Sequence, residues 1–277
     1  MTARGITTRA SINGHTTLVV ILAHPIAHVR TPSEMNRHFS AIGRDAVLVP
    51  MHVLPADLPD VAAVLRRVPN LGGIVVTVPH KEAIAKLCDR LTDAAKLVGA
   101  VNVIRREADG TLTGGQFDGE GFIAGLRAAG HEVRGKRVWM AGAGGAAAGI
   151  GYAMLRHGVA ALTIHNRTHA RAEALAARLR GAMPGAPVAS GSEDPAGHDI
   201  VVNATSLGLE PHDALPVDMA RMTPSMLAAE VVMQPDRTAF LHAAAAIGCA
   251  THPGLPMLLE QIPILADFVT GTGAVPA

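Results

Sequence analysis

The 277-residue sequence has few aromatic residues, little cysteine and almost no net charge. Only 3% of its residues are aromatic, so a surface on which nucleic-acid bases stack is not expected. Lys and Arg number 24 against 23 Asp and Glu, which leaves a formal net charge of +1 and no overall field to attract nucleic acid or an acidic membrane. The two cysteines, Cys88 and Cys249, provide no disulfide framework and are expected to be reduced core residues.

Apolar residues are plentiful: nine apolar types make up 49% of the chain, while 17% of the residues are charged, which excludes intrinsic disorder. The first twenty residues carry Arg4 and Arg9 but no apolar segment before Leu18, so no secretory signal is expected and a cytoplasmic location is the default. The uncharged run Val138–Leu155 is long enough for a membrane helix, but its glycines favour a strand, a turn and a helix. We expect a soluble protein of about two domains.

Apolar strands alternate with helical patterns along the chain. Strands are predicted over residues 18–22, 46–51, 73–78, 101–104, 111–115, 136–141, 161–165, 199–203 and 226–232. Helices are predicted over residues 32–42, 57–67, 80–87, 119–129, 170–179, 238–247 and 257–268, with another ending at 157. The pair of strands around Asp109 and Gly110 is typical of a hairpin. This order predicts an α/β fold of mostly parallel sheets with right-handed crossovers, with the seam between domains near Gly119–Gly130.

A glycine-rich turn follows the strand that begins at Lys136. Residues 142–147 fit the pattern G-x-G-x-x-G/A, with Ala147 in the last position. The residues expected at the turn are Gly142, Gly144, Gly145 and Ala146. Such glycines bring backbone N–H groups close to a pyrophosphate at a helix N-terminus, so the turn predicts nucleotide binding. The alternative is a tightly packed corner between strand and helix with no ligand.

The next strand distinguishes between the two nicotinamide cofactors. A free ribose 2′-hydroxyl is usually held by Asp or Glu about 20 residues after the turn. This chain has Asn166, Arg167 and Thr168 there, and Arg171 follows one turn later. Arginine forms forked, charge-assisted hydrogen bonds with phosphate, so NADP(H) is favoured over NAD(H). The alternative is that both arginines simply belong to a solvated helix face.

Eight segments in this order resemble the shikimate/quinate dehydrogenase family, and together they extend over nearly the whole chain. They are His24–His28, Val76–Lys81, Gly99–Asn102, Asp118–Phe122, Gly142–Ala147, Asn166–Thr168, Asn203–Thr205 and Met257–Gln261. The resemblance implies an N-terminal α/β substrate domain, a Rossmann domain that binds NADP, and a cleft between them. We therefore expect a substrate-binding and catalytic domain over residues 1–118, an NADP-binding domain over 119–254, and a final helix over about 255–277 that packs on the first domain.

The resemblance implies that Lys81 and Asp118 are the catalytic pair. Reduction of a ketone produces an alkoxide that needs a proton, and a lysine oriented by a carboxylate is able to supply it. Lys81 follows an apolar strand, at the end of the sheet where parallel sheets bind their ligands. Family positions that contact substrate hydroxyls correspond to Thr77, Asn102 and Gln261. Thr205 and Met257 correspond to positions near the cofactor and its nicotinamide.

The chain departs from the family where the substrate is bound. The family's carboxylate-binding Ser-x-Ser-Pro segment is Val29, Arg30, Thr31 and Pro32 here, so Thr31 keeps one hydroxyl and Val29 removes the other. Loss of one hydrogen bond to a charged group costs about 10–150-fold in binding. Further departures replace the family's Tyr by Met233, its Asn-Thr-Asp by Gln116–Asp118, an Asn by Val75 and a Gly by Pro256. We expect weak or absent turnover of shikimate itself.

Other functions remain open. A related dehydrogenase of quinate or of another cyclic polyol or hydroxy acid shares these motifs. A regulatory module that binds NADP(H) without catalysis is the rival from another class, and the methylenetetrahydrofolate dehydrogenase type shares the two-domain plan but lacks these motifs. Neither histidine pair with i, i+4 spacing, His24/His28 or His165/His169, lies on one predicted helix, so no metal is expected. The expected partner is a small molecule, and the expected state is a monomer or homodimer.

Overall fold

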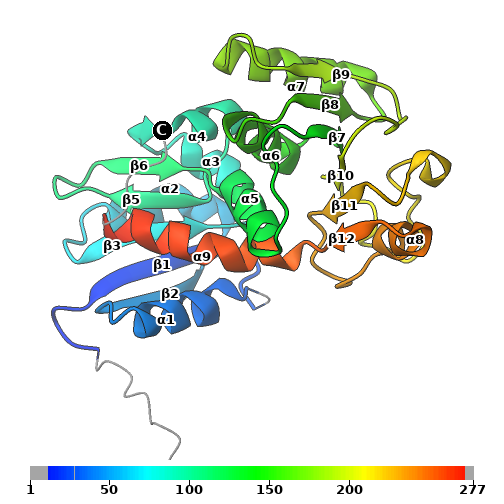
Figure 1. Ribbon diagram of the computed structural model, residues 1–277. Helices are drawn as coiled ribbons and strands as arrows, with labels where there is room; N and C mark the ends of the chain where they lie inside the picture. Colours follow the sequence, from blue (N-terminus) through cyan, green and yellow to red (C-terminus); the bar gives the residue numbers. More distant parts are fainter. Residues whose placement is uncertain (1–11, 28, 272–277) are drawn as a thin grey trace, which may run out of the picture. The chain divides into compact units, whose positions relative to one another are not determined.

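The structure is a computed structural model, and it describes residues 12–27 and 29–271. The chain forms two compact units (Figure 1): Met1–Thr92, Val101–Gly115 and Ile262–Ala277 make the first, and Asp93–Ala100 and Gln116–Gln261 the second. Each unit contains one six-stranded sheet with helices, which confirms the predicted α/β class. Of the sequence features above, Arg4, Arg9 and His28 lie outside the described residues.

The sheet of the first unit combines parallel and antiparallel strands. In spatial order it contains β2 (Ala46–His52), β1 (Thr17–Ala23), β3 (Leu71–Val76), β5 (Val103–Arg106), β6 (Leu112–Gly115) and β4 (Arg90–Leu91). β1 is parallel to both β2 and β3, and β4 is parallel to β6. β5 is antiparallel to β3 and β6, so the predicted hairpin around Asp109 and Gly110 is present.

Helices of the first unit follow directly from the apolar pattern. They are α1 (Thr31–Ala41), the 3₁₀ turn η1 (Pro55–Asp57), α2 (Leu58–Leu65), α3 (Lys81–Ala85) and the C-terminal part of α9 (Leu255–Thr270). α1 carries a proline in its first turn and buries Thr31, Met35 and Phe39, which are spaced four residues apart. α9 lies close to β3 because Gly73 has no side chain: a Cβ there would come within 2.7 Å of Val269 Cγ1.

The sheet of the second unit is entirely parallel. In spatial order it contains β12 (Ala250–His252), β11 (Leu227–Glu230), β10 (Ile200–Asn203), β7 (Arg137–Ala141), β8 (Ala161–His165) and β9 (Val188–Ser190). Its helices are α4 (Asp93–Val98), α5 (Asp118–Ala128), α6 (Gly145–Arg156), α7 (His169–Ala182), the 3₁₀ turn η2 (Met219–Arg221), α8 (Ala239–Ile247) and the first part of α9. The strand order reverses between β7 and β10, and doubly wound sheets bind ligands at the carboxyl ends of such strands.

The second sheet is buried on both faces, which explains the continuous apolar runs of its strands. Val138 and Met140 belong to a core cluster that includes residues of α5, α6 and α7, whereas Trp139 and Ala141 belong to another that includes residues of α8. Side chains alternate between the faces of a strand, so both faces require apolar residues. The uncharged run is thus a strand, a turn and a helix, as predicted. No helix in the described part of the chain is long and apolar enough to span a membrane.

Short elements are where the structure differs from the sequence predictions. β3 lies two residues earlier than predicted and ends at Val76. α3 covers only Lys81–Ala85 and is shorter than expected. α4 and the strands β4, β9 and β12 were not predicted, because two to six residues are too few to show a periodic pattern.

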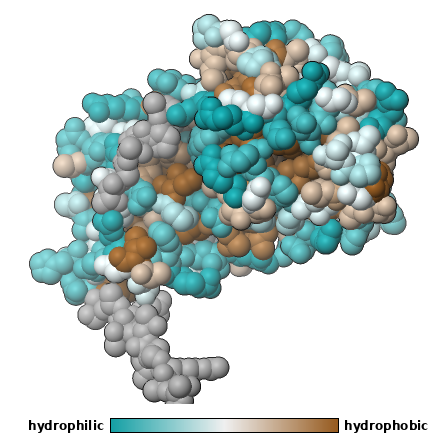
Figure 2. Space-filling view, in the orientation of Figure 1, coloured by the Kyte–Doolittle hydropathy of each residue, from teal (hydrophilic) through white to brown (hydrophobic). Residues whose placement is uncertain are grey.

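The face drawn in Figure 2 is mainly hydrophilic, with scattered hydrophobic residues.

Candidate functional site

Lys81 is held at the carboxyl end of the first sheet, directly after β3. Its backbone carbonyl accepts a hydrogen bond from the N–H of Val101 at 2.9 Å. The neighbouring Asn102 is 3% exposed, and its carbonyl accepts from Val76 N at 2.8 Å. Thr77 N donates to Leu22 O in β1 at 3.1 Å. The first unit therefore brings together the backbones of Thr77, Lys81 and Asn102, all three of which were predicted as site residues.

His80 anchors the segment that carries the lysine. Its side chain is 1% exposed, and its Nε2 lies 2.9 Å from the carbonyl oxygen of Val53. The His80 carbonyl accepts from Ile84 N at 2.9 Å, so the same residue also begins α3. A buried histidine that is tied to a neighbouring segment and to the helix fixes the start of α3, where Lys81 is the first residue. This role was not predicted, because an isolated histidine gives no pattern in the sequence.

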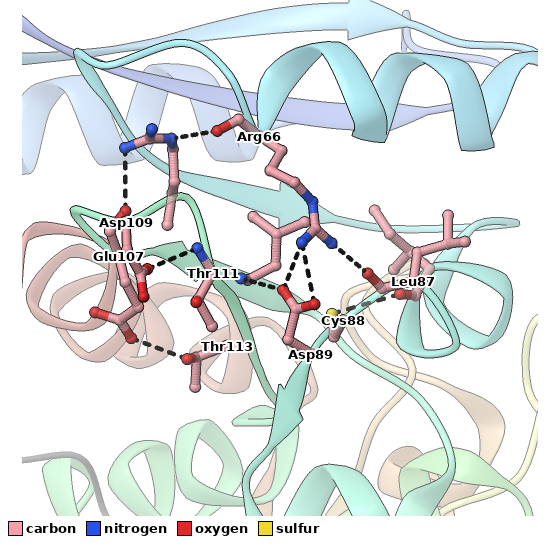
Figure 3. A network of polar contacts seen from close by, with 11 residues as sticks. Arg66, Leu87, Cys88, Asp89, Glu107, Asp109, Thr111 and Thr113 are labelled. Atoms are coloured by element: carbon pink, nitrogen blue, oxygen red, sulfur yellow. Dashed lines mark hydrogen bonds and ion pairs between the residues drawn. The ribbon is translucent and has the colours of Figure 1, made fainter.

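A polar network in the first unit fixes the chain beyond α3 (Figure 3). The Arg66 guanidinium donates to both carboxylate oxygens of Asp89, at 3.0 and 2.8 Å, and to the carbonyl of Leu87 at 3.2 Å. Asp89 also accepts from Leu112 N at 2.8 Å, and these bonds hold the pKa of its carboxyl below the usual value. Burial raises the pKa of the Cys88 thiol, which lies within this network, to about 11. The network has a structural role, and Cys88 stays protonated.

Asp118 is the first residue of α5 and belongs to the second unit. Its N–H donates to Gln116 Oε1 at 2.7 Å, and its Oδ1 accepts from Gln261 Nε2 at 3.1 Å. The second unit therefore brings Asp118 together with Gln261, which was predicted as a substrate contact. Gln116 was noted only as a departure from the family pattern. Its position two residues before Asp118 is the signal for its role.

The glycine turn of the second unit has the geometry of an anion site. Gly142 has φ +116°, and a Cβ there would come within 2.6 Å of Ala204 O. A Cβ on Gly144 would meet no atom within 4 Å, so the space above the turn is open. No side chain caps the N-terminus of α6, so its first backbone N–H groups are available for an anionic ligand. These features fit the pyrophosphate of a dinucleotide.

Two arginines lie near the end of β8. Arg167 and Arg171 are exposed, and within the described part of the chain neither guanidinium forms a hydrogen bond or an ion pair. Asn166 Nδ2 donates to the carbonyl of Thr168 at 2.9 Å, which shapes the turn before α7. The absence of a protein partner leaves both guanidiniums available for a phosphate, and no carboxylate is present in this turn.

A second polar cluster lies at the carboxyl ends of β10 and β11. Thr205 Oγ1 donates to Asn203 Oδ1 at 2.7 Å, and the Thr205 methyl lies near the glycine turn, 3.3 Å from a Cβ built on Gly142. Glu230 is fully buried, accepts from Thr238 Oγ1 at 2.8 Å, and has no partner for Oε1 among the described residues. Burial raises the pKa of the Glu230 carboxyl. Glu230 was not predicted to belong to this cluster.

The remaining predicted contacts lie on several segments. Val29 is half-buried, its N–H donates to Ile26 O at 3.1 Å, and Thr31 is 7% exposed at the start of α1. Met233 follows β11 and is half-buried, while Met257 is 7% exposed in the first turn of α9.

Metal coordination finds no support among the described residues. No group of three or more His, Cys, Asp or Glu side chains there is arranged to hold a metal ion. His24 Nδ1 instead lies 2.8 Å from His52 Nε2, at the carboxyl ends of β1 and β2.

Comparisons with known proteins identify relatives of both units. Residues 21–104 match the family model described as shikimate dehydrogenase substrate binding domain. Residues 126–211 match the model described as shikimate / quinate 5-dehydrogenase. The shikimate dehydrogenase (NADP(+)) of Rubrobacter xylanophilus is 42% identical over 257 residues, which cover 90% of this chain and 89% of the relative.

Solved structures share the fold over nearly the whole chain. The shikimate 5-dehydrogenase of Listeria monocytogenes, solved with shikimate and NAD, is 33% identical, with a TM-score of 0.86 over 96% of this chain and 95% of the other. The ligand-free 5-ketofructose reductase of Gluconobacter sp. strain CHM43 is also 33% identical, with a TM-score of 0.83 over 92% of this chain and 93% of the other.

Proposed function

Because this chain belongs to the shikimate/quinate dehydrogenase family, we propose that it is an NADP(H)-dependent dehydrogenase of a shikimate-like cyclic hydroxy compound. The observation that carries the proposal is the placement of Lys81 at the carboxyl end of a sheet, tied through its backbone to Val101, next to the buried Asn102. Ligands of parallel sheets bind at this end. The first unit would then carry Lys81 and most of the substrate contacts, and the second would bind NADP(H) and carry Asp118.

The residues of the second unit fit NADP(H) as cofactor. When bound, it supplies the hydride for ketone reduction or accepts one from the alcohol. The backbone of Gly142, Gly144, Gly145 and Ala146 would hold the pyrophosphate. Asn166, Arg167, Thr168 and Arg171 would hold the ribose 2′-phosphate, and Thr205 and Met257 would lie toward the nicotinamide. Support for the 2′-phosphate comes from two guanidiniums that have no partner in the described ranges 12–27 and 29–271, and from the absence of a carboxylate in the turn at residues 166–168.

Lys81 is proposed to move the proton. During reduction, Lys81 Nζ donates a proton to the developing alkoxide oxygen, and during oxidation Nζ accepts it from the hydroxyl. Asp118 is the proposed carboxylate that orients the ammonium group. Thr77 and Asn102 are proposed to bind substrate hydroxyls, and Gln261 either binds a hydroxyl or acts through Asp118.

The identity of the substrate depends on the segment at Val29. Val29 has no side-chain donor, so Thr31 is the proposed remaining hydroxyl contact to a carboxylate, and Met233 lines the same substrate. Without a hydrogen-bond donor at position 29, the site gains little selectivity for substrates that carry a carboxylate. Reduction of a non-carboxylated polyhydroxy ketone is the second candidate, and it is supported by Val29 and by the likeness to a 5-ketofructose reductase.

The experiment is a turnover screen of shikimate, quinate and cyclic or open-chain polyols with NADP⁺ and NAD⁺. We expect turnover with NADP⁺, weak activity on shikimate, and a higher kcat/KM for shikimate in Val29→Ser. No gain in that variant would contradict the account of the lost donor.

Lys81→Ala tests the catalytic pair, with an expected loss of about 10²–10⁴-fold in kcat. Unchanged turnover in Lys81→Ala would exclude the proposed role. A chain that binds NADP(H) but turns over no substrate would be a regulatory module. A cytoplasmic location and a monomeric or dimeric state remain predictions.

A further inference from the structure

Two histidines at neighbouring strand ends of the first sheet form a hydrogen-bonded pair. His24 directly follows β1, and His52 is the last residue of β2. His24 Nδ1 lies 2.8 Å from His52 Nε2, and the two ring planes are within 16° of parallel. His52 is exposed and His24 is half-buried, so small molecules from solvent can reach the pair. The function proposed above gives no role to these two side chains.

Backbone hydrogen bonds hold this pair at the carboxyl end of the sheet. His24 N donates to Val78 O at 3.2 Å, and Val53 N donates to Ala23 O at 3.2 Å. The proposed substrate contact Thr77 directly follows β3, and the strand order β3, β1, β2 puts the two histidines on the next two strand ends. Neighbouring strands lie about 4.8 Å apart, so a substrate of several carbons that contacts Thr77 extends to the pair.

The pair offers one hydrogen-bond acceptor and one hydrogen-bond donor. A neutral imidazole has one N–H and one bare nitrogen. When one ring donates its N–H to the other, the donating ring keeps a bare outer nitrogen and the accepting ring keeps an outer N–H. The outer nitrogens, His24 Nε2 and His52 Nδ1, have no partner among the described residues. Whichever ring donates, one outer nitrogen therefore accepts a hydrogen bond from a ligand and the other donates one.

We infer that His24 and His52 together bind two neighbouring hydroxyl groups of a polyol substrate, away from the carbon that exchanges hydride. This inference rests on the proposed function and selects its second candidate substrate, a non-carboxylated polyhydroxy ketone or the corresponding polyol. A hydroxyl both donates and accepts, so one hydroxyl donates to the bare nitrogen while its neighbour accepts from the N–H. A carboxylate only accepts, so it leaves the bare nitrogen unsatisfied, and the pair favours hydroxyls. Val29, which offers no side-chain donor to a carboxylate, agrees with this preference.

The test compares two kinds of substitution in the full chain. His24→Phe and His52→Phe keep a planar ring and remove its nitrogens. His24→Gln and His52→Asn keep a polar amide near the place of each outer nitrogen, because the Gln amide reaches as far as Nε2 and the Asn amide as far as Nδ1. His15→Phe, which alters an exposed histidine of the same unit, is the control. KM and kcat are measured with NADP⁺ on D-mannitol, D-sorbitol and shikimate, and the Kd of NADP⁺ is measured by calorimetry.

We expect each Phe variant to raise the KM of the polyol about 2–10-fold, and the double Phe variant about 5–100-fold. Removal of contacts that are equal in the ground and transition states leaves kcat unchanged, and the Kd of NADP⁺ should not change either. The Gln and Asn variants, the control, and the KM of shikimate in every variant should resemble the wild type.

Two results would overturn the inference while the proposed function stands. One is an unchanged KM of the polyol in both Phe variants, and the other is a wild type that oxidises shikimate but neither polyol. A wild type without turnover on any substrate refutes the proposed function itself, and the inference with it.

Discussion

The side chain of Asn36 in α1 binds both backbone polar groups of Leu48 in β2. Its Oδ1 accepts from Leu48 N at 2.8 Å, and its Nδ2 donates to Leu48 O at 2.9 Å. β2 is an edge strand, and unpaired edges are templates for association with other chains. The asparagine amide thus occupies the positions of a neighbouring strand, and Pro50 removes a further donor from the same edge.

Asn36→Ala is expected to destabilise the first unit and to expose its edge. Loss of the two hydrogen bonds should cost about 1–3 kcal/mol in the free energy of unfolding. Urea unfolding measures that cost, and light scattering at increasing protein concentration measures association. Ser40→Ala, an exposed position on the same helix, is the control. Unchanged stability and an unchanged molecular mass would contradict the role assigned to Asn36.

Arg167→Ala and Arg171→Ala are expected to weaken NADP⁺ binding while leaving NAD⁺ binding almost unchanged. Each hydrogen bond from a guanidinium to a phosphate contributes about 1.5–3 kcal/mol, which corresponds to about 10–150-fold in Kd. Titration calorimetry with both cofactors measures the difference. Arg178→Ala, exposed on the same helix α7, controls for the loss of one positive charge. Equal losses for both cofactors would exclude recognition of the 2′-phosphate.

His252 is expected to make the protein less stable in acid. The side chain is 2% exposed, and burial together with nearby His131 lowers the pKa of His252 from 6.5 to about 4. Below pH 6.5 the unfolded chain binds a proton that the folded chain does not bind until the pH approaches 4. The free energy of unfolding therefore falls as the pH falls through this interval, by at most about 3 kcal/mol.

Urea unfolding of the wild type and of His252→Gln at pH 8 and pH 5 checks this prediction. His242→Gln, which alters an exposed histidine, is the control. The loss of stability on acidification should be smaller in His252→Gln and unchanged in His242→Gln. If His252→Gln lost as much stability on acidification as the wild type, other groups would control the response to acid.

Glu230→Gln is expected to stabilise the second unit increasingly as the pH rises. Burial raises the pKa of the Glu230 carboxyl, so the folded chain keeps a proton that the unfolded chain has already released. The contribution of this carboxyl to stability is therefore complete at low pH and is lost as the pH rises above 4.5. Glutamine does not titrate, so the difference between variant and wild type should grow from pH 4 to pH 8 in thermal unfolding. A constant difference would show that the pKa of this carboxyl is the same in the folded and the unfolded chain.

Much of the fold was predictable from the sequence because its signals are local. The apolar strands of both sheets, the glycine turn at 142–147 and most of the helices follow from the periodicity of side chains within one segment. The motifs around Lys81 and Asp118 likewise identified the family before any geometry was known. Elements of two to six residues, such as α4 and β12, left no such pattern.

By itself, then, the sequence determined the α/β class, the family, the glycine turn and the arginines without a carboxylate beside them, since each depends on residues close together in the chain. Only the tertiary structure showed that Gln261 reaches Asp118 across 143 residues, that Asn36 covers Leu48, and that Glu230 is buried. These features depend on which surfaces meet when helices pack on sheets. Local propensity contains no information about those distances, because packing brings together segments that are remote in sequence.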